Sequence, residues 1–211
     1  MPDDSLRAGR DEYAAERAEE LDPRVLPGTY TVRMTKDQNV YTTQLVVTAD
    51  PRARYTAAER KEQFDLAMKL YNLLGDMTFA VDRINGVRLS LDADAARLPA
   101  NDPLVARLQN ASQQVDELRK KIVATKEGGA ITGEQRLREY LTELYGNVLG
   151  YEGRPTQTQI MRTAAIEREL QDISKDFDAW LTKEMSALNS ALTARQLPPI
   201  KVMDRAEWEG Q

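Results

Sequence analysis

The chain has 211 residues, of which 30% are charged and only 6% are aromatic. A chain of this length has room for one domain of ordinary size or for a helical bundle with a small appendage, and its composition is typical of long amphipathic helices rather than of a β-sandwich. The formal net charge is −5 and no basic stripe is present, so there is little electrostatic reason to expect binding to nucleic acid or to an anionic membrane.

The sequence contains neither cysteine nor histidine. Disulfides, thiolate metal sites, cysteine nucleophiles, the usual general base and the commonest metal ligand are therefore excluded. The carboxylates that remain lie at helix positions typical of a solvated charged face, as at Glu139, Glu143, Glu167, Glu169, Asp172, Asp176 and Asp178. We therefore expect a chain that is not an enzyme, with no catalytic, metal-binding or cofactor-binding residues and no cofactor.

Neither a membrane-spanning helix nor a signal peptide is expected. No stretch approaches the roughly 20 apolar residues that a spanning helix needs. The start of the chain, Met1-Pro2-Asp3-Asp4, lacks the basic and apolar regions of a signal peptide. The compartment therefore has to be inferred from other features.

Residues 1–25 are expected to form an N-terminal arm. Residues 5–21 are rich in helix-forming residues but have few apolar anchors, which is typical of either a marginal helix or a disordered arm. Asp22-Pro23 ends this segment, because the residue before a proline is disfavoured in the helical conformation.

Residues 26–52 predict a β-hairpin. Residues 29–34 alternate, residues 36–39 form a turn, and residues 40–47 are rich in residues that favour strands. In the first strand Tyr30, Val32 and Met34 share one face, as a half-buried strand requires. Because a two-stranded ribbon is only marginally stable in water, we expect it to pack on the helices, on a partner, or on strands missing from this chain.

Residues 53–200 predict an antiparallel bundle of about four helices, so the expected fold class is mainly α with an N-terminal β-hairpin. Thr56 and Glu59 form a capping-box signature for a first helix from about residue 56 to 97. Asp102 as the cap and Pro103 at the first helical position begin a second helix, which ends before Gly128-Gly129.

Two further helices complete the expected bundle. Thr132, with Gln135 three residues on, is the expected cap of the third helix, which Gly150 stops. Thr156 precedes a fourth helix that extends to about residue 196, where Leu197-Pro198-Pro199 terminates it. The connections are brief, and short loops force neighbouring helices to pack antiparallel.

Residues 201–211 form a polar tail that contains Trp208. A tryptophan outside the bundle suggests a residue that docks on a partner. Two alternatives stay open: the tryptophan folds back on the bundle, or the tail is disordered.

Four segments resemble a known protein family. They are residues 26–34 (Leu-Pro-Gly-Thr-Tyr-Thr-Val-Arg-Met), residues 40–47 (Val-Tyr-Thr-Thr-Gln-Leu-Val-Val), Asp50-Pro51-Arg52, and residues 63–67 (Gln-Phe-Asp-Leu-Ala). Together they resemble the C-terminal region of bacterial sortilin-like, sialidase-repeat exported proteins. In that family a β-propeller is followed by an immunoglobulin-like domain with a last hairpin of Pro-Gly-Thr-Tyr-Thr-Val type, then by a helical segment that ends near Leu-Pro-Pro, here Leu197-Pro198-Pro199.

The resemblance covers about residues 26–200, and it implies that residues 26–52 are the remnant of a β-sandwich. The propeller and the earlier immunoglobulin-like strands have no counterpart in this sequence, so no functional residue is carried over. We expect a non-catalytic structural or protein-binding accessory module, a subunit or domain of a larger extracytoplasmic assembly, periplasmic or secreted. Its partner would be a protein or a neighbouring β-domain, held by Tyr30, Val32, Tyr41, Leu45, Val47 and Trp208.

Alternatives remain open. The chain could be the supporting subunit of a sialidase-repeat hydrolase whose active site lies on another chain or domain, and its assembly could be a membrane or envelope complex. A third hypothesis is a cytosolic coiled-coil adaptor, against which the irregular glycines and the lack of four clean heptads argue.

Overall fold

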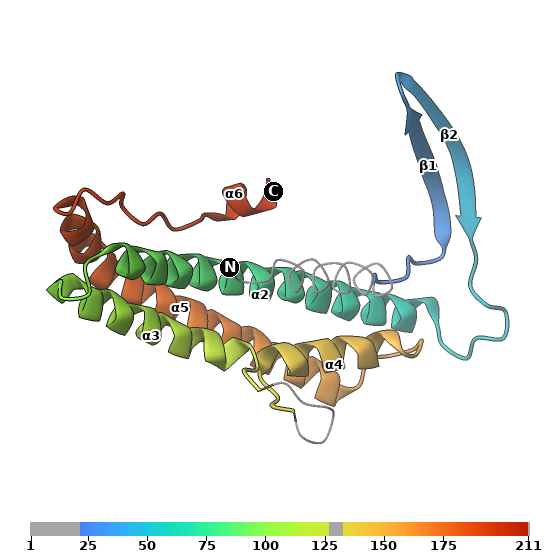
Figure 1. The fold of residues 1–211 in the computed structure, drawn as a ribbon. Coiled ribbons are helices and arrows are strands. Elements are labelled where there is room, and N and C mark those ends of the chain that lie inside the picture. Colours follow the sequence, from blue (N-terminus) through green and yellow to red (C-terminus); the bar gives the residue numbers. More distant parts are fainter. Residues whose placement is uncertain (1–21, 127–132, 211) are drawn as a thin grey trace. The chain divides into compact units, whose positions relative to one another are not determined.

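The computed structural model describes residues 22–126 and 133–210 of the chain. These residues form five helices and one two-stranded β-hairpin, which confirms the expected mainly α class with an N-terminal hairpin (Figure 1). Most of the predicted N-terminal arm, the predicted turn at Gly128-Gly129 and the predicted cap Thr132 lie outside the described residues.

The chain divides into two compact units. Of the described residues, one unit contains residues 22–71 and Tyr145–Ile160, and the other contains residues 72–126, 133–144 and 161–210. The two longest helices pass from one unit into the other. The hairpin thus shares its unit with the first turns of a long helix.

The hairpin consists of β1 (Gly28–Lys36) and β2 (Asn39–Val47), which pair antiparallel with Lys36 opposite Asn39. Only Asp37 and Gln38 form the turn, and Asp37 has a φ of 55°. Aspartate tolerates this left-handed conformation better than most residues, because its short side chain bonds to the local backbone. A two-residue loop of this kind sets the register of the strands.

The expected capping signals start the first two long helices. In α2 (Ala57–Arg97) the Thr56 hydroxyl accepts from the Glu59 N–H at 3.2 Å, and the Glu59 carboxylate accepts from the Thr56 N–H at 2.8 Å. In α3 (Pro103–Ile122) the Asp102 carboxylate accepts from the Leu104 N–H at 2.8 Å. Both caps satisfy helix N–H groups that have no partner inside the helix.

The expected start of the third helix was wrong, because α4 (Leu137–Leu149) begins five residues after Thr132. Glu134 accepts from the Thr125 backbone N–H at 2.9 Å and pairs with Arg136, so it belongs to the preceding loop. The cap lies instead at Arg136, whose N–H donates to the Glu139 carboxylate at 2.9 Å. The helix ends before Gly150, as expected.

The last long helix, α5 (Gln157–Thr193), has the expected capping box of Thr156 and Gln159. At its other end Gln196 has a φ of 63°, the Gln196 N–H bonds to the Thr193 carbonyl, and the Leu197 N–H bonds to the Leu192 carbonyl. These bonds form a Schellman motif, which closes the helix near the expected residue 196.

Helices α2, α3 and α5 pack together in the second unit around an apolar core. Fully buried side chains come from all three helices and include Ile84, Leu91, Leu108, Val115, Phe177 and Leu188. The start of α3 is held to the end of α5 by Asp102 and Arg195, whose two hydrogen bonds both measure 2.7 Å. The part of the chain that the structure describes contains no helix with the length and apolar character needed to cross a membrane.

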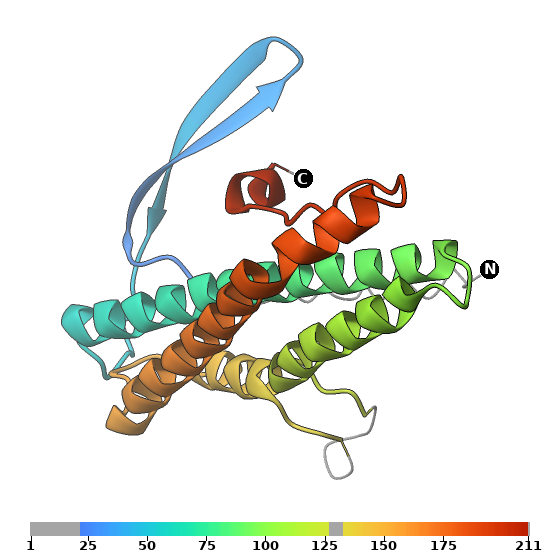
Figure 2. The same cartoon turned by 90° about the vertical axis from the view of Figure 1, so that its left-hand side faces the viewer.

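The predicted polar tail contains a short helix, α6 (Arg205–Glu209). Figures 1 and 2 agree that α6 lies beside α2. Trp208 makes this contact: its ring centroid lies 5.7 Å from that of Phe79, and its indole N–H donates to the Asp82 carboxylate at 2.8 Å.

Candidate partner-binding site

One face of the hairpin carries the sequence-predicted site residues. Residues directly opposite each other in an antiparallel pair point to the same face. The register places Tyr30 opposite Leu45, Met34 opposite Tyr41, Gly28 opposite Val47 and Val32 opposite Thr43. The five predicted hairpin residues therefore share one surface, called here the apolar face, whose members are Tyr30, Val32, Met34, Tyr41, Leu45 and Val47.

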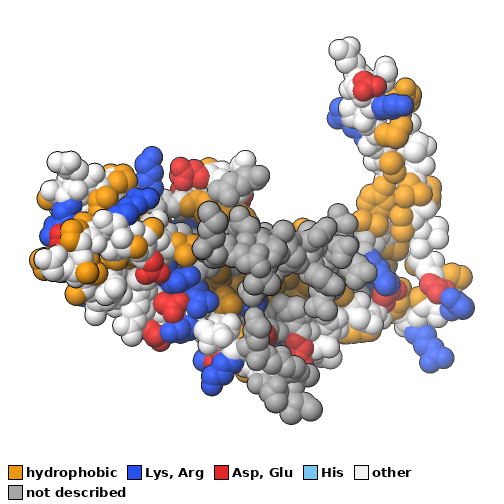
Figure 3. All heavy atoms as spheres, in the orientation of Figure 1, with side chains coloured by type: hydrophobic (Ala, Val, Ile, Leu, Met, Phe, Trp, Pro, Cys, Tyr) orange, Lys and Arg blue, Asp and Glu red, His pale blue; other side chains and the backbone are white. Residues whose placement is uncertain are grey.

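The apolar face is largely exposed. Val32 is 45% exposed, Tyr41 53% and Leu45 51%, while Tyr30 and Val47 are half-buried. Met34 is 56% exposed. The predicted site did not include it, although it alternates with Tyr30 and Val32 on the same face of β1. Figure 3 shows hydrophobic side chains gathered along the hairpin.

The opposite face of the hairpin is mostly polar. Its middle is made by Thr31, Arg33, Thr42 and Gln44, and the Gln44 amide donates to the Thr31 hydroxyl at 3.1 Å. Val40 and Val46, near the two ends of β2, are its exposed apolar residues. The charged residues of the hairpin, Arg33, Lys36 and Asp37, lie in its distal half and at its turn. The ribbon is thus amphipathic, as a strand pair that covers a core is.

The base of the hairpin is fixed by Tyr30. Its hydroxyl donates to the Leu26 carbonyl at 2.6 Å, and its ring lies against Gly28. Pro27, between Leu26 and Gly28, cannot donate a backbone hydrogen bond. The side chain of Tyr30 therefore closes the bend that leads into β1.

The junction that follows the hairpin is ordered by local bonds. The Asp50 carboxylate accepts from the Arg52 N–H at 2.9 Å and from its guanidinium at 2.9 Å. The bond from the Arg52 side chain, followed by the one from its backbone, holds the pKa of Asp50 below its ordinary value. The Asp-Pro-Arg sequence of the resemblance is therefore a turn that leads the chain from β2 toward α2.

Two buried polar side chains of α2 hold this unit together. Arg60 donates to the Arg24 carbonyl at 2.9 Å, just before the hairpin. Gln63 donates to the Val148 carbonyl at 2.7 Å and to the Tyr151 carbonyl, where α4 ends. The sequence reasoning missed both residues, although their spacing to Ala67 along the helix marks them as core positions.

Trp208 belongs to the other unit and is half-buried on α2 rather than free in a polar tail. The Arg205 guanidinium lies 5.0 Å from the ring centroids of both Phe79 and Trp208, and it pairs with Asp76 at 3.0 Å. Much of the indole surface is thus used within the chain, in agreement with the alternative that it folds back. A docking role for Trp208 stays a prediction.

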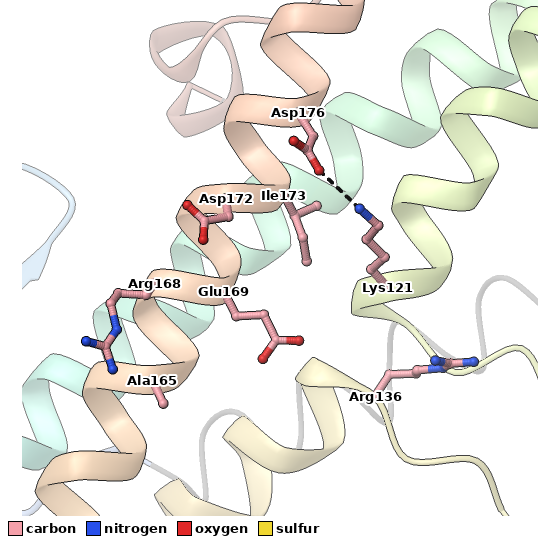
Figure 4. Close-up of a pocket in the computed structure, with 8 residues that line it drawn as sticks. All are labelled: Lys121, Arg136, Ala165, Arg168, Glu169, Asp172, Ile173 and Asp176. Atoms are coloured by element: carbon pink, nitrogen blue, oxygen red, sulfur yellow. Dashed lines mark hydrogen bonds and ion pairs between the residues drawn. The ribbon is translucent and has the colours of Figure 1, made fainter.

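A surface depression of about 540 Å³ beside α5 offers no specific ligand chemistry. Its charged lining combines three cations with three carboxylates, and Lys121 already pairs with Asp176 at 3.1 Å (Figure 4). Arg168 and Arg136 point away from each other in that view. Among the residues of known placement, no cluster of acidic side chains could hold a metal ion.

Comparisons with known proteins find no counterpart: no family model, curated protein or solved structure matches the chain. Any conclusion about function therefore rests on the sequence and on the geometry of the molecule, in which the hairpin presents an exposed apolar face.

Proposed function

We propose that the chain is a non-catalytic protein-binding module that docks on a neighbouring β-domain through the apolar face of its hairpin. The observation that carries this proposal is the gathering of six apolar side chains on one side of a ribbon that is exposed on both sides. A partner that covers this face would remove from water its three most exposed side chains, Met34, Tyr41 and Leu45.

The energetics of a two-stranded ribbon favour such a partner. A single hairpin is marginally stable at best in water, and a third strand or a packed face is what makes it independently stable. Burying a fully exposed Val, Leu or Met side chain contributes roughly 1.5–3 kcal/mol, and Val32, Met34 and Leu45, which are about half exposed, would each gain about half of that. Both strands also present an unpaired edge in the two-stranded sheet, which is a template for pairing with another chain.

The non-catalytic part of the proposal rests on composition. With no histidine and no cysteine, the chain lacks the side chains used most often as general base and as thiol nucleophile. The resemblance of the hairpin to exported sialidase-repeat proteins supports an extracytoplasmic assembly as the setting.

Face-specific capture tests this function. The tagged chain and its Leu45→Lys variant would be incubated with an extract of the source organism, beside Thr42→Lys as the control on the polar face. A partner retained by the unchanged chain and by Thr42→Lys, but lost by Leu45→Lys, is the expected result. Identical capture by all three proteins would contradict docking through the apolar face.

A further inference from the structure

The bend that leads into the hairpin has a specific form. Tyr30 lies near the start of β1, and its hydroxyl returns at 2.6 Å to the carbonyl of Leu26, four residues upstream. Neither the alternation of the strand nor the turn at Asp37 requires this bond. The bond is therefore a second observation, distinct from the apolar character of the face to which the Tyr30 ring belongs.

This bond matches the tyrosine corner of Greek-key β-sandwiches. There, a tyrosine near the start of the next-to-last strand, strand F, donates its hydroxyl to the backbone a few residues upstream. The last strand, strand G, pairs antiparallel with it, as β2 pairs with β1. The two faces agree with this assignment, because the inner face of a sandwich sheet is apolar and its outer face polar.

We infer that the partner is an antiparallel β-sandwich that lacks its own last two strands, and that β1 and β2 complete it. In such a sandwich strand F lies between strand C and strand G. A strand of the partner would therefore pair with the free edge of β1, while the second sheet of the partner packs on the apolar face. The free edge of β2 remains at the border of the completed sheet. This inference rests on the proposed function and adds the kind of partner and the edge that it uses.

The pair Thr31 and Gln44 distinguishes the two edges. These residues are opposite each other on the polar face, one on each strand. A strand added beside β1 would lie about 5 Å from Thr31 and about 10 Å from Gln44, because neighbouring strands are spaced at about 4.8 Å. Replacing either residue removes the same hydrogen bond between them, so the two variants are matched in the bond that they lose.

The experiment uses the full chain with a short diazirine-bearing photoreactive residue in place of Thr31 or of Gln44. Each protein is incubated with the extract used for capture and irradiated, and the crosslinked peptides are identified by mass spectrometry. We expect the position-31 protein to crosslink to an extended, alternating segment of a β-rich protein, with at least a fivefold lower yield from position 44.

The opposite preference, with the higher yield at position 44, would overturn the inference. So would a crosslink between two copies of the chain, or a partner segment that is helical. If Leu45→Lys abolishes capture but neither position crosslinks, the docking function stands and the edge assignment fails. If the unchanged chain captures no protein at all, the proposed function fails, and this inference fails with it.

Discussion

At the residue scale, Tyr30 connects local geometry to the proposed assembly. Removing its hydroxyl with Tyr30→Phe deletes the bond to the Leu26 carbonyl while leaving the ring against Gly28. A hydrogen bond of this kind contributes about 1 kcal/mol, so amide hydrogen exchange in β1 should be about fivefold faster. Tyr41→Phe is the matched control, since no hydrogen bond from the Tyr41 hydroxyl is found within the described residues. Equal exchange in both variants would show that the corner does not stabilise the hairpin.

Asp102 makes the stability of the bundle depend on pH. The guanidinium of Arg195, followed by the Leu104 N–H, holds the pKa of Asp102 below its ordinary value of 3.8. A lowered pKa in the folded state means that this carboxylate stabilises the fold above about pH 4, and that the stabilisation is lost as pH falls further. Asp102→Asn keeps a good helix cap but loses the ion pair.

The expected result for Asp102→Asn is a Tm about 2–4 °C lower than that of the unchanged chain at pH 7, with the difference shrinking between pH 4 and pH 2. Thermal unfolding followed by circular dichroism over this pH range measures it. Lys175→Met, which removes an exposed ion pair with Asp172, is the control and should change the Tm little at either pH. A difference that stays constant from pH 7 to pH 2 would contradict the role of the Asp102 charge.

At the scale of elements, α5 ends in a conformation that its sequence does not favour. Gln196 adopts a φ of 63°, where glycine avoids the steric cost that other residues bear. Gln196→Gly should therefore raise the free energy of unfolding by about 0.5–1 kcal/mol, measured by urea denaturation. Gln171→Gly, at an exposed position inside α5, should instead lower it by about 1 kcal/mol. The Schellman assignment fails if both glycines destabilise the chain equally.

The elements that could be predicted from the sequence are those determined by local bonds. Thr56, Asp102 and Thr156 cap their helices through groups two or three residues away, so their signatures are visible in short stretches of sequence. The same rule predicted a helix start at Thr132, and this prediction was wrong. Glu134 bonds instead to Thr125, nine residues earlier, and so belongs to the loop. A helix start is hidden from local reasoning when a loop uses the nearby side chains over a longer distance.

The candidate site shows the same limit. Period-two alternation predicted that Tyr30, Val32 and Met34 share a face, because that property belongs to the strand itself. The register of the structure adds Tyr41, Leu45 and Val47 to the same face. The bond from Tyr30 to Leu26 and the contact of Trp208 with Asp82 depend on backbone bends and on packing between segments up to 126 residues apart. Neither hydropathy nor spacing carries that information, so the corner and the position of α6 were found only in the structure.

At the scale of the whole molecule, the hairpin and the helices differ in what stabilises them. Side chains of the helices are buried in apolar cores, with Leu91 fully inaccessible, whereas most hairpin side chains remain exposed. Removing the hairpin therefore removes a surface for a partner but little of the burial that stabilises the chain. The helical content should survive its loss.

Replacing residues 28–47 by a short Gly-Ser linker tests this separation. We expect the helical circular dichroism to be retained and the Tm to change by no more than about 2 °C, because few buried contacts are lost. Leu91→Ala, by contrast, should destabilise the chain by about 2–5 kcal/mol through the cavity that it leaves. If the deletion lowers the Tm as much as Leu91→Ala does, the hairpin is part of the structural core. It would then be needed for folding, and its apolar face would not be free for a partner.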